Sequence, residues 1–137
     1  MERFDTKIAI AIRADLAVWQ KLNVTAFLSA AIAGADHAVI GAPYRDADGR
    51  AYLATLVQPV LVFSGDGAAL RAAYDRALAR GLSLAIYTHE MFATGNDVDN
   101  RAAVAAVASE ALQLVGIALR APRRDVDKVV KGLALHP

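Results

Sequence analysis

Polar side chains gather in two segments of the sequence, each directly after an apolar run typical of a buried strand. Arg13 and Asp15 follow the first run, and Lys21 and Asn23 come shortly after them. The second segment, residues 88–99, supplies six further candidates: Thr88, His89, Glu90, Thr94, Asn96 and Asp97. Cations, carboxylates, an imidazole and hydroxyls are the groups that acid–base and hydrolytic chemistry uses.

Each of these candidates also has a structural interpretation. Asp15 is placed to cap the first turn of a helix, and Arg13 is placed to pair with it. Lys21 falls in the first turns of the same predicted helix, where a lysine is usually solvated. His89 and Glu90 put an imidazole beside a carboxylate, although adjacent loop residues tend to point apart. The functional and the structural interpretation therefore both stay open.

Familiar metal, cofactor and nucleophile motifs are absent from the sequence. The chain has no cysteine, which excludes disulfides, a thiol nucleophile and a cysteine-based zinc site. No group of histidines and carboxylates has the spacing of metal ligands, and there is no phosphate loop, dinucleotide fingerprint or Gly-x-Ser-x-Gly elbow. We expect neither a metal nor a cofactor.

The apolar pattern predicts strands alternating with helices along the chain. Strands are expected over 7–13, 60–63, 82–87 and 114–119, and helices over 16–33, 66–80, 100–112 and from Pro122 onward. Asp48-Gly49, in a polar stretch between apolar runs, predicts a hairpin. The helix over 16–33 is apolar nearly all round past Val24, so it needs cover on a second side, from a neighbouring segment or from another subunit.

These elements indicate one α/β domain over residues 1–137, a three-layer α/β/α sandwich with a mixed sheet of about four core strands plus the hairpin. The strands on either side of the 66–80 helix should run parallel, joined by a right-handed crossover. Ligands of such sheets bind beyond the carboxyl ends of the strands. Both polar segments follow strand ends, so we expect the site between them.

Length and charge limit the function classes. The 137 residues carry 15 basic and 14 acidic side chains, a net charge of +1, which is unlike a dedicated nucleic-acid binder. The apolar stretch over 22–35 is shorter than the roughly 20 residues that cross a bilayer. The first apolar run is also too short for a secretion signal. A cytoplasmic protein without membrane contact is therefore expected.

Residues 7–16, ending in Arg13-Ala14-Asp15-Leu16, resemble the opening strand and Arg-x-Asp-Leu motif of class II (archaeal/eukaryotic-type) peptidyl-tRNA hydrolases. Residues 58–62, 81–84, 115–117 and 127–129 follow in that family's order. A closer resemblance is to a bacterial family of unknown function with the same hydrolase-like fold. That resemblance is carried by residues 19–28, 87–88, 92–97 and 131–137.

The hydrolase resemblance implies cleavage of the ester that joins a peptide to tRNA. It also implies a catalytic lysine on the first helix, and an aspartate and a threonine in the loop after the third strand. Lys21 matches that lysine after a one-residue deletion. His89 and Ala93 occupy the other two positions without a gap, whereas a shift by one residue gives Glu90 and Thr94. The low net charge argues against tRNA, whose binding depends on many phosphate contacts.

Two main hypotheses follow. In the first, the protein is a small hydrolase of ester or amide bonds: Lys21 polarises a carbonyl, His89 or Glu90 is the general base, and Thr94 binds substrate. Further substrate contacts would come from Arg13, Asp15, Asn23, Thr88, Asn96 and Asp97. In the second, it is a non-catalytic module that binds a small molecule or forms a homodimer. A tRNA or ribosome accessory protein is the third alternative. The first hypothesis requires its four catalytic candidates to line one pocket.

Overall fold

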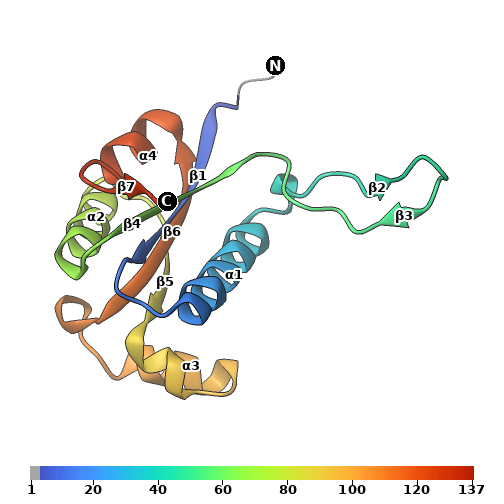
Figure 1. Cartoon of the computed structure of the whole chain (residues 1–137). Helices are drawn as coiled ribbons and strands as arrows, with labels where there is room; N and C mark the ends of the chain where they lie inside the picture. Colours follow the sequence, from blue (N-terminus) through green and yellow to red (C-terminus); the bar gives the residue numbers. More distant parts are fainter. Residues whose placement is uncertain (1–3) are drawn as a thin grey trace.

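The computed structural model describes residues 4–137, in which a five-stranded sheet lies between two layers of helices (Figure 1). The sheet order is β5-β6-β1-β4-β7. Its strands are β1 (Thr6–Arg13), β4 (Val60–Gly65), β5 (Ala85–Thr88), β6 (Leu114–Pro122) and β7 (Ala134–Leu135). β1 pairs in parallel with β4 and antiparallel with β6, which confirms the mixed sheet.

β1 occupies the centre of the sheet because both of its faces are apolar. Ile8, Ile10 and Ile12 point to one face and the small Ala9 and Ala11 to the other, and all five are buried. The predicted parallel orientation of the strands flanking residues 66–80 is confirmed, since β6 runs antiparallel to both β1 and β5. The two strands are not neighbours, because β6 and β1 lie between them.

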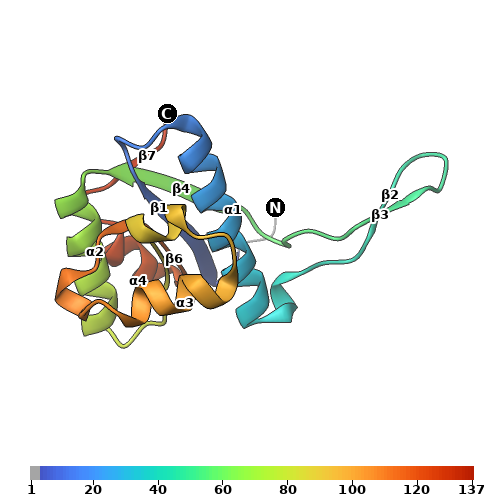
Figure 2. The ribbon, with the colours of Figure 1, turned by 90° about the horizontal axis from the view of Figure 1, so that it is seen from below.

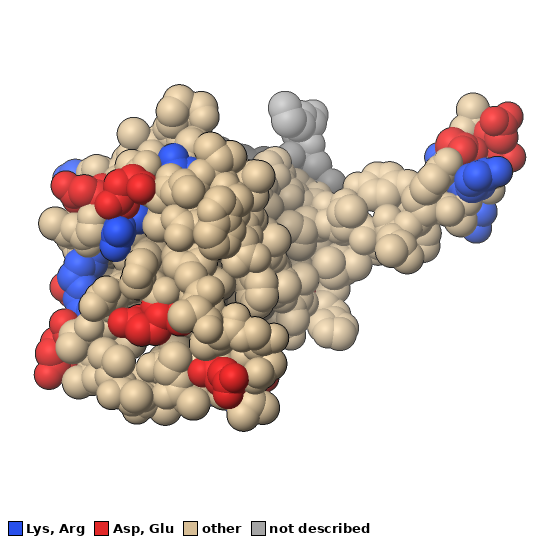
Figure 3. All heavy atoms as spheres, turned by 60° about the horizontal axis from the view of Figure 1, so that its bottom comes forward, with Lys and Arg blue, Asp and Glu red and all other residues tan. Residues whose placement is uncertain are grey.

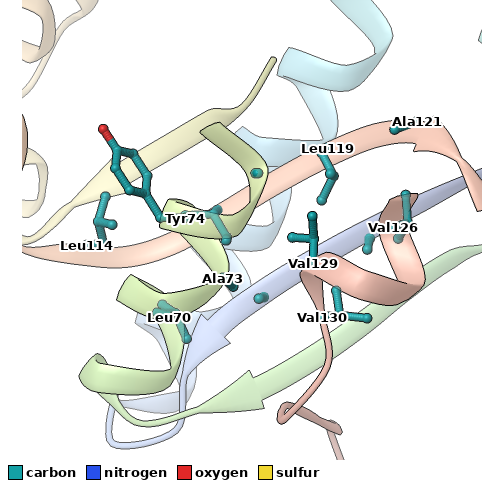
Figure 4. Close-up of a cluster of buried hydrophobic side chains, with 13 residues drawn as sticks. Leu70, Ala73, Tyr74, Leu114, Leu119, Ala121, Val126, Val129 and Val130 are labelled. Carbon is teal, nitrogen blue, oxygen red and sulfur yellow. The ribbon is translucent and has the colours of Figure 1, made fainter. Parts of the chain in front are cut away.

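One long helix covers one face of the sheet, and two shorter helices cover the other (Figures 1 and 2). The long helix is α1 (Val18–Ala35), which buries Val24, Leu28 and Ile32. The opposite layer consists of α2 (Gly67–Ala79) and α4 (Arg123–Val129). Figure 4 shows their apolar side chains packed with those of β6. The predicted three-layer arrangement is thus confirmed.

Local signals placed α2 correctly but misplaced the starts of two other helices. Asp66 caps α2 by accepting a hydrogen bond from Ala69 N at 2.8 Å. Asp15 does not cap α1: the helix follows Ala17, whose N–H donates to Gln20 Oε1 instead. Helix α3 (Asp97–Ala105) starts earlier than predicted, because Asn96 caps it by accepting from Asp99 N at 2.9 Å, and it also ends earlier than predicted.

Three other segments differ from the predicted elements. The first part of residues 88–99, expected to lack regular structure, holds the 3-10 helix η2 (His89–Ala93). The predicted strand over 82–87 begins only at Ala85, and the short β7 was not predicted. β7 forms through its pairing with β4, in which Leu135 lies opposite Phe63. These two residues are far apart in the sequence, so local sequence patterns could not predict the strand.

The predicted hairpin forms an arm that projects from the body (Figures 1 and 2). Its strands are β2 (Tyr44–Arg45) and β3 (Ala51–Tyr52), which follow the short 3-10 helix η1 (His37–Val39). Gly49 adopts a φ of 85°, the left-handed conformation for which the Asp-Gly signal selects. None of the helices in the described part of the chain combines the length and hydropathy needed to span a bilayer.

Candidate functional site

A pocket of about 290 Å³ opens where α1, the end of β5, η2 and the start of α3 meet. Its lining residues come from both predicted polar segments: Trp19, Asn23, Phe27, Tyr87, Met91, Phe92, Thr94, Gly95, Asn96, Asp97 and Asn100. Four of the predicted site residues are among them, namely Asn23, Thr94, Asn96 and Asp97. The pocket lies beyond the carboxyl end of β5, as expected for an α/β sheet.

Aromatic rings form one wall of this pocket. Trp19 and Phe92 meet edge to face with ring centroids 5.8 Å apart, and Phe27 and Tyr87 do so at 5.6 Å. Tyr87 and Phe92 link the two pairs at 5.1 Å. Edge-to-face contacts of this kind fix the ring orientations, because each positive ring edge meets a negative ring face. The result is a continuous wall of four rings.

Hydrogen-bonding groups stand beside the aromatic wall. Asn23 Nδ2 donates to the Tyr87 hydroxyl oxygen at 3.0 Å. Burial raises the pKa of Tyr87, so its hydroxyl keeps its proton and can donate it to a ligand. The Thr94 hydroxyl donates to the Met91 carbonyl oxygen at 2.9 Å and contacts Asn100 Oδ1. The other ends of these two side-chain amides, Asn23 Oδ1 and Asn100 Nδ2, have no hydrogen-bond partner among the described residues.

The start of α3 forms the outer rim of the pocket. Besides accepting from Asp99 N, the Asn96 side chain donates to Asp99 Oδ2 at 2.9 Å, so both ends of its amide are occupied. Asp97 forms an ion pair with Arg101 one turn further along the helix. These contacts indicate a structural role for Asn96 and leave Asp97 at the exposed edge.

Lys21 lies in a different cavity, a groove of about 560 Å³ on another side of α1. Its Nζ is 3.2 Å from His136 Nε2, and His136 Nδ1 is 2.9 Å from the carbonyl oxygen of Pro137. The imidazole therefore carries its proton on Nδ1 and accepts from the lysine. Lys21 and Asn23 are two positions apart, which places them about 200° apart around a helix. They cannot both face one pocket.

The other predicted catalytic residues also lie outside the pocket lining. His89 is exposed and packs edge to face against Phe92 at 6.1 Å, while its main-chain N–H donates to Gln113 O at 2.9 Å. Glu90 follows in the same 3-10 helix and does not line the pocket. Of the four predicted catalytic residues, only Thr94 lines it, so the structure does not bring them together.

Three of the predicted binding residues, Arg13, Asp15 and Thr88, lie outside the pocket lining. Arg13 Nε donates to Asp15 Oδ1 at 2.7 Å, and this guanidinium holds the pKa of the exposed Asp15 carboxyl below its usual value. Thr88 is only 1% exposed and faces away from the pocket, toward the α2 side of the sheet opposite Leu114. Its hydroxyl has no hydrogen-bond partner among the described residues.

The aromatic residues of the pocket were missed by sequence reasoning that searched for polar groups. A signal was present, because Trp19, Asn23 and Phe27 are spaced by four and so share one face of α1. Tyr87 directly precedes the predicted 88–99 segment and Phe92 lies within it, but only the tertiary fold places them against that face. Within residues 4–137, no three or more His, Asp or Glu side chains are grouped so that they could hold a metal ion.

Comparisons with known proteins agree with the resemblance to a family of unknown function. The solved structure of a protein of unknown function from Agrobacterium tumefaciens strain C58 shares 47% sequence identity with this chain. It superposes with a TM-score of 0.96, the match covering 98% of this chain and 100% of that one. No functionally curated protein matches the sequence. The family model described as "protein of unknown function (DUF2000)" matches residues 6–137, and the chain therefore belongs to the DUF2000 family.

Proposed function

We propose that the protein is a non-catalytic binding module for a small planar heteroaromatic molecule, held in the pocket between α1, η2 and α3. The observation that carries this proposal is the four-ring wall beside amide and hydroxyl groups with unused hydrogen-bonding capacity. Ring faces favour a flat aromatic ligand, and the polar groups would fix its orientation.

The size and charge of the pocket narrow the ligand class. A volume of about 290 Å³ is at the lower end of ligand pockets, which run from roughly 300 to 1,000 Å³, and suits one ring or two fused rings. Asp97 is the one charged residue in the lining, and it is paired with Arg101. A neutral or weakly basic ligand is therefore favoured over an anion.

The chemistry of the lining supports binding rather than hydrolysis. An activated hydroxyl nucleophile needs an adjacent base. The Thr94 hydroxyl is hydrogen-bonded to an amide oxygen and a carbonyl oxygen, and neither can accept its proton as a base would. Lys21, His89 and Glu90 lie outside this lining. The class II peptidyl-tRNA hydrolase fold and its tRNA ester hydrolysis stay predictions from the sequence resemblance.

Ligand binding can be followed by fluorescence, because Trp19 is the single tryptophan of the chain and lines the pocket. A panel of free purines, pyrimidines and other heteroaromatic bases should include compounds that change its emission in a saturable way. Asn23→Ala removes a pocket amide and leaves the Tyr87 hydroxyl without its donor, so affinity should fall about tenfold, the effect of one hydrogen bond of about 1.4 kcal/mol.

Ser29→Ala is the matched control, since Ser29 is a polar residue of the same helix α1 but lies outside the pocket lining. Under the proposal it leaves the affinity unchanged. Saturable binding that Asn23→Ala does not weaken, or no binding across the panel, would overturn the proposed function. Turnover of simple esters, amides or aminoacyl-tRNA that Lys21→Ala and Glu90→Ala abolish would support the hydrolase hypothesis instead.

A further inference from the structure

The arm formed by residues 41–57 exposes apolar side chains that no other part of residues 4–137 covers. All residues from 42 to 53 are exposed. Tyr44 and Tyr52 are paired across the two strands and are 54% and 50% exposed, and Leu53 is 89% exposed. An isolated two-stranded hairpin is marginally stable in water, so such an arm gains stability from a surface that packs against it.

The accessible surface of the chain is larger than that of a compact monomer of the same mass. The chain exposes 8279 Å². A compact monomer of this mass exposes about 6,900 Å², which leaves an excess of about 1,400 Å². A standard protein–protein interface buries about 800 Å² on each partner, so the excess is large enough for one.

The outward face of α1 is the second uncovered apolar surface. Val18 and Leu22 are 73% and 67% exposed, and the small residues Ala26 and Ala30 continue this face at the same four-residue spacing. A solvent-facing helix usually carries charges there, yet α1 has a single charged residue, Lys21. Figure 3 shows charges gathered at the tip of the arm, whereas the rest of the arm and the adjoining body surface are uncharged on the side drawn there.

We propose that a second copy of this chain covers both surfaces, with the arm of each copy lying along the outward face of α1 in the other. The dimensions agree: residues 41–48 span about 25 Å as extended chain, and the 18 residues of α1 span about 27 Å. Because arm and helix belong to the same chain, a twofold pair makes both contacts at once.

The amount of surface also fits this exchange of arms. The arm and the outward face of α1 together offer about 20 residues per copy, at the lower end of the roughly 20–30 residues that each side of a standard interface uses. A partner of another kind would need to match both surfaces independently. The self-complementary pair satisfies the requirement with this chain alone.

Cross-linking tests which surfaces meet, because the wild-type chain has no cysteine. Leu53→Cys and Ala26→Cys are prepared as separate variants, one lengthened by a tag, mixed, and treated with a short bis-maleimide. Arm exchange predicts a mixed product that joins the two variants. The control pairs Leu53→Cys with Leu78→Cys, a site on α2 that is 50% exposed, and should give little product.

Each outcome of this experiment decides for or against the proposal. A dominant Leu53→Cys homodimer would indicate arm-on-arm contact, and a dominant Ala26→Cys homodimer helix-on-helix contact. Either result, or a mixed product no stronger than the Leu78→Cys control, overturns arm exchange. The tag makes the three products distinguishable by mass.

Light scattering gives an independent test with the full chain. The wild type should have twice the 14.5 kDa mass of one chain. Leu22→Asp, which places a charge in the proposed interface, should return it to one chain mass with unchanged circular dichroism. Leu78→Asp should remain dimeric. A monomeric wild type, or a Leu22→Asp variant that is as dimeric as the wild type, contradicts the proposal.

Discussion

Replacing Gly116 with alanine should force α1 away from the sheet. Gly116 lies in β6 directly beneath α1, and a Cβ at this position would be 2.5 Å from Val24 Cγ1 and 3.0 Å from Leu28 Cδ1. Carbon atoms normally pack at about 3.5–4.0 Å, so the neighbours would have to move by about 1 Å. Val24 is completely buried and β-branched, which restricts its side chain to one preferred rotamer in a helix.

The expected magnitude is a net loss of about 1–2 kcal/mol in the free energy of unfolding. Overpacking a core with one methyl group costs about 1–3 kcal/mol. Removing the flexibility of glycine from the unfolded chain offsets about 0.4–1 kcal/mol of this. Urea denaturation followed by circular dichroism measures the difference, and the melting temperature should fall by about 3–8 °C.

Gly34→Ala is the matched control in the same layer of the molecule. Gly34 lies in α1, and apart from its chain neighbours and the adjacent helix backbone no atom of residues 4–137 is within 4 Å of an added Cβ. Alanine there should therefore stabilise the protein by about 0.5–1 kcal/mol through its helix propensity. The opposite signs at the two glycines distinguish a steric effect from a general response to alanine.

A double variant tests whether the Val24 contact is the cause. In Gly116→Ala/Val24→Ala the new methyl group occupies space that the valine methyl groups vacate. The double variant should then lose less stability than the two single variants together, by about 1 kcal/mol or more. Additivity to within about 0.5 kcal/mol would refute the steric explanation, as would a Gly116→Ala protein as stable as the wild type.

Three further outcomes are expected. Thr88→Val removes a buried hydroxyl that has no partner among the described residues, so unfolding by urea should show a gain of about 1 kcal/mol, and a loss would reveal a hidden partner. Arg13→Ala removes the guanidinium that lowers the pKa of Asp15, so an NMR titration should show this pKa rising toward its ordinary value. In the wild type the ion pair persists at neutral pH and is lost as the pH falls through the lowered pKa. Asp46→Ala removes the acceptor of the Tyr52 hydroxyl and of main-chain amides in the turn of the arm, so hydrogen exchange should quicken there and the raised pKa of Tyr52 should fall. Unchanged exchange would contradict the role of Asp46.

Some features of the fold depend on neighbours in the sequence and could be predicted from it. The alternation of isoleucine with alanine in β1 predicts a strand covered on both faces, and each side chain type lies as expected. Asp66 caps α2, and Gly81 follows that helix with a φ of 70°. Asp48-Gly49 marks the turn of the arm. These outcomes depend on backbone conformation and on hydrogen bonds that span a few residues.

The order of the strands and the partners of each polar side chain could not be predicted in this way. β6 separates β1 from β5 because it pairs with both, and nothing local specifies that choice. Lys21 contacts His136, which is 115 positions away. Asp15 is close enough to cap a helix, yet the nearby Arg13 guanidinium binds its carboxylate.

For the candidate site, the sequence by itself determined which residues share a face of α1, since that depends only on the helical repeat. The helical repeat puts Trp19, Asn23 and Phe27 on one face and Lys21 on a different side, although the site predicted from the sequence grouped Lys21 with Asn23. Only the tertiary structure decided which face meets η2 and α3. That choice follows from burying Val24 and Leu28 against Gly116, which fixes the rotation of α1 about its axis and turns the aromatic face toward the end of β5.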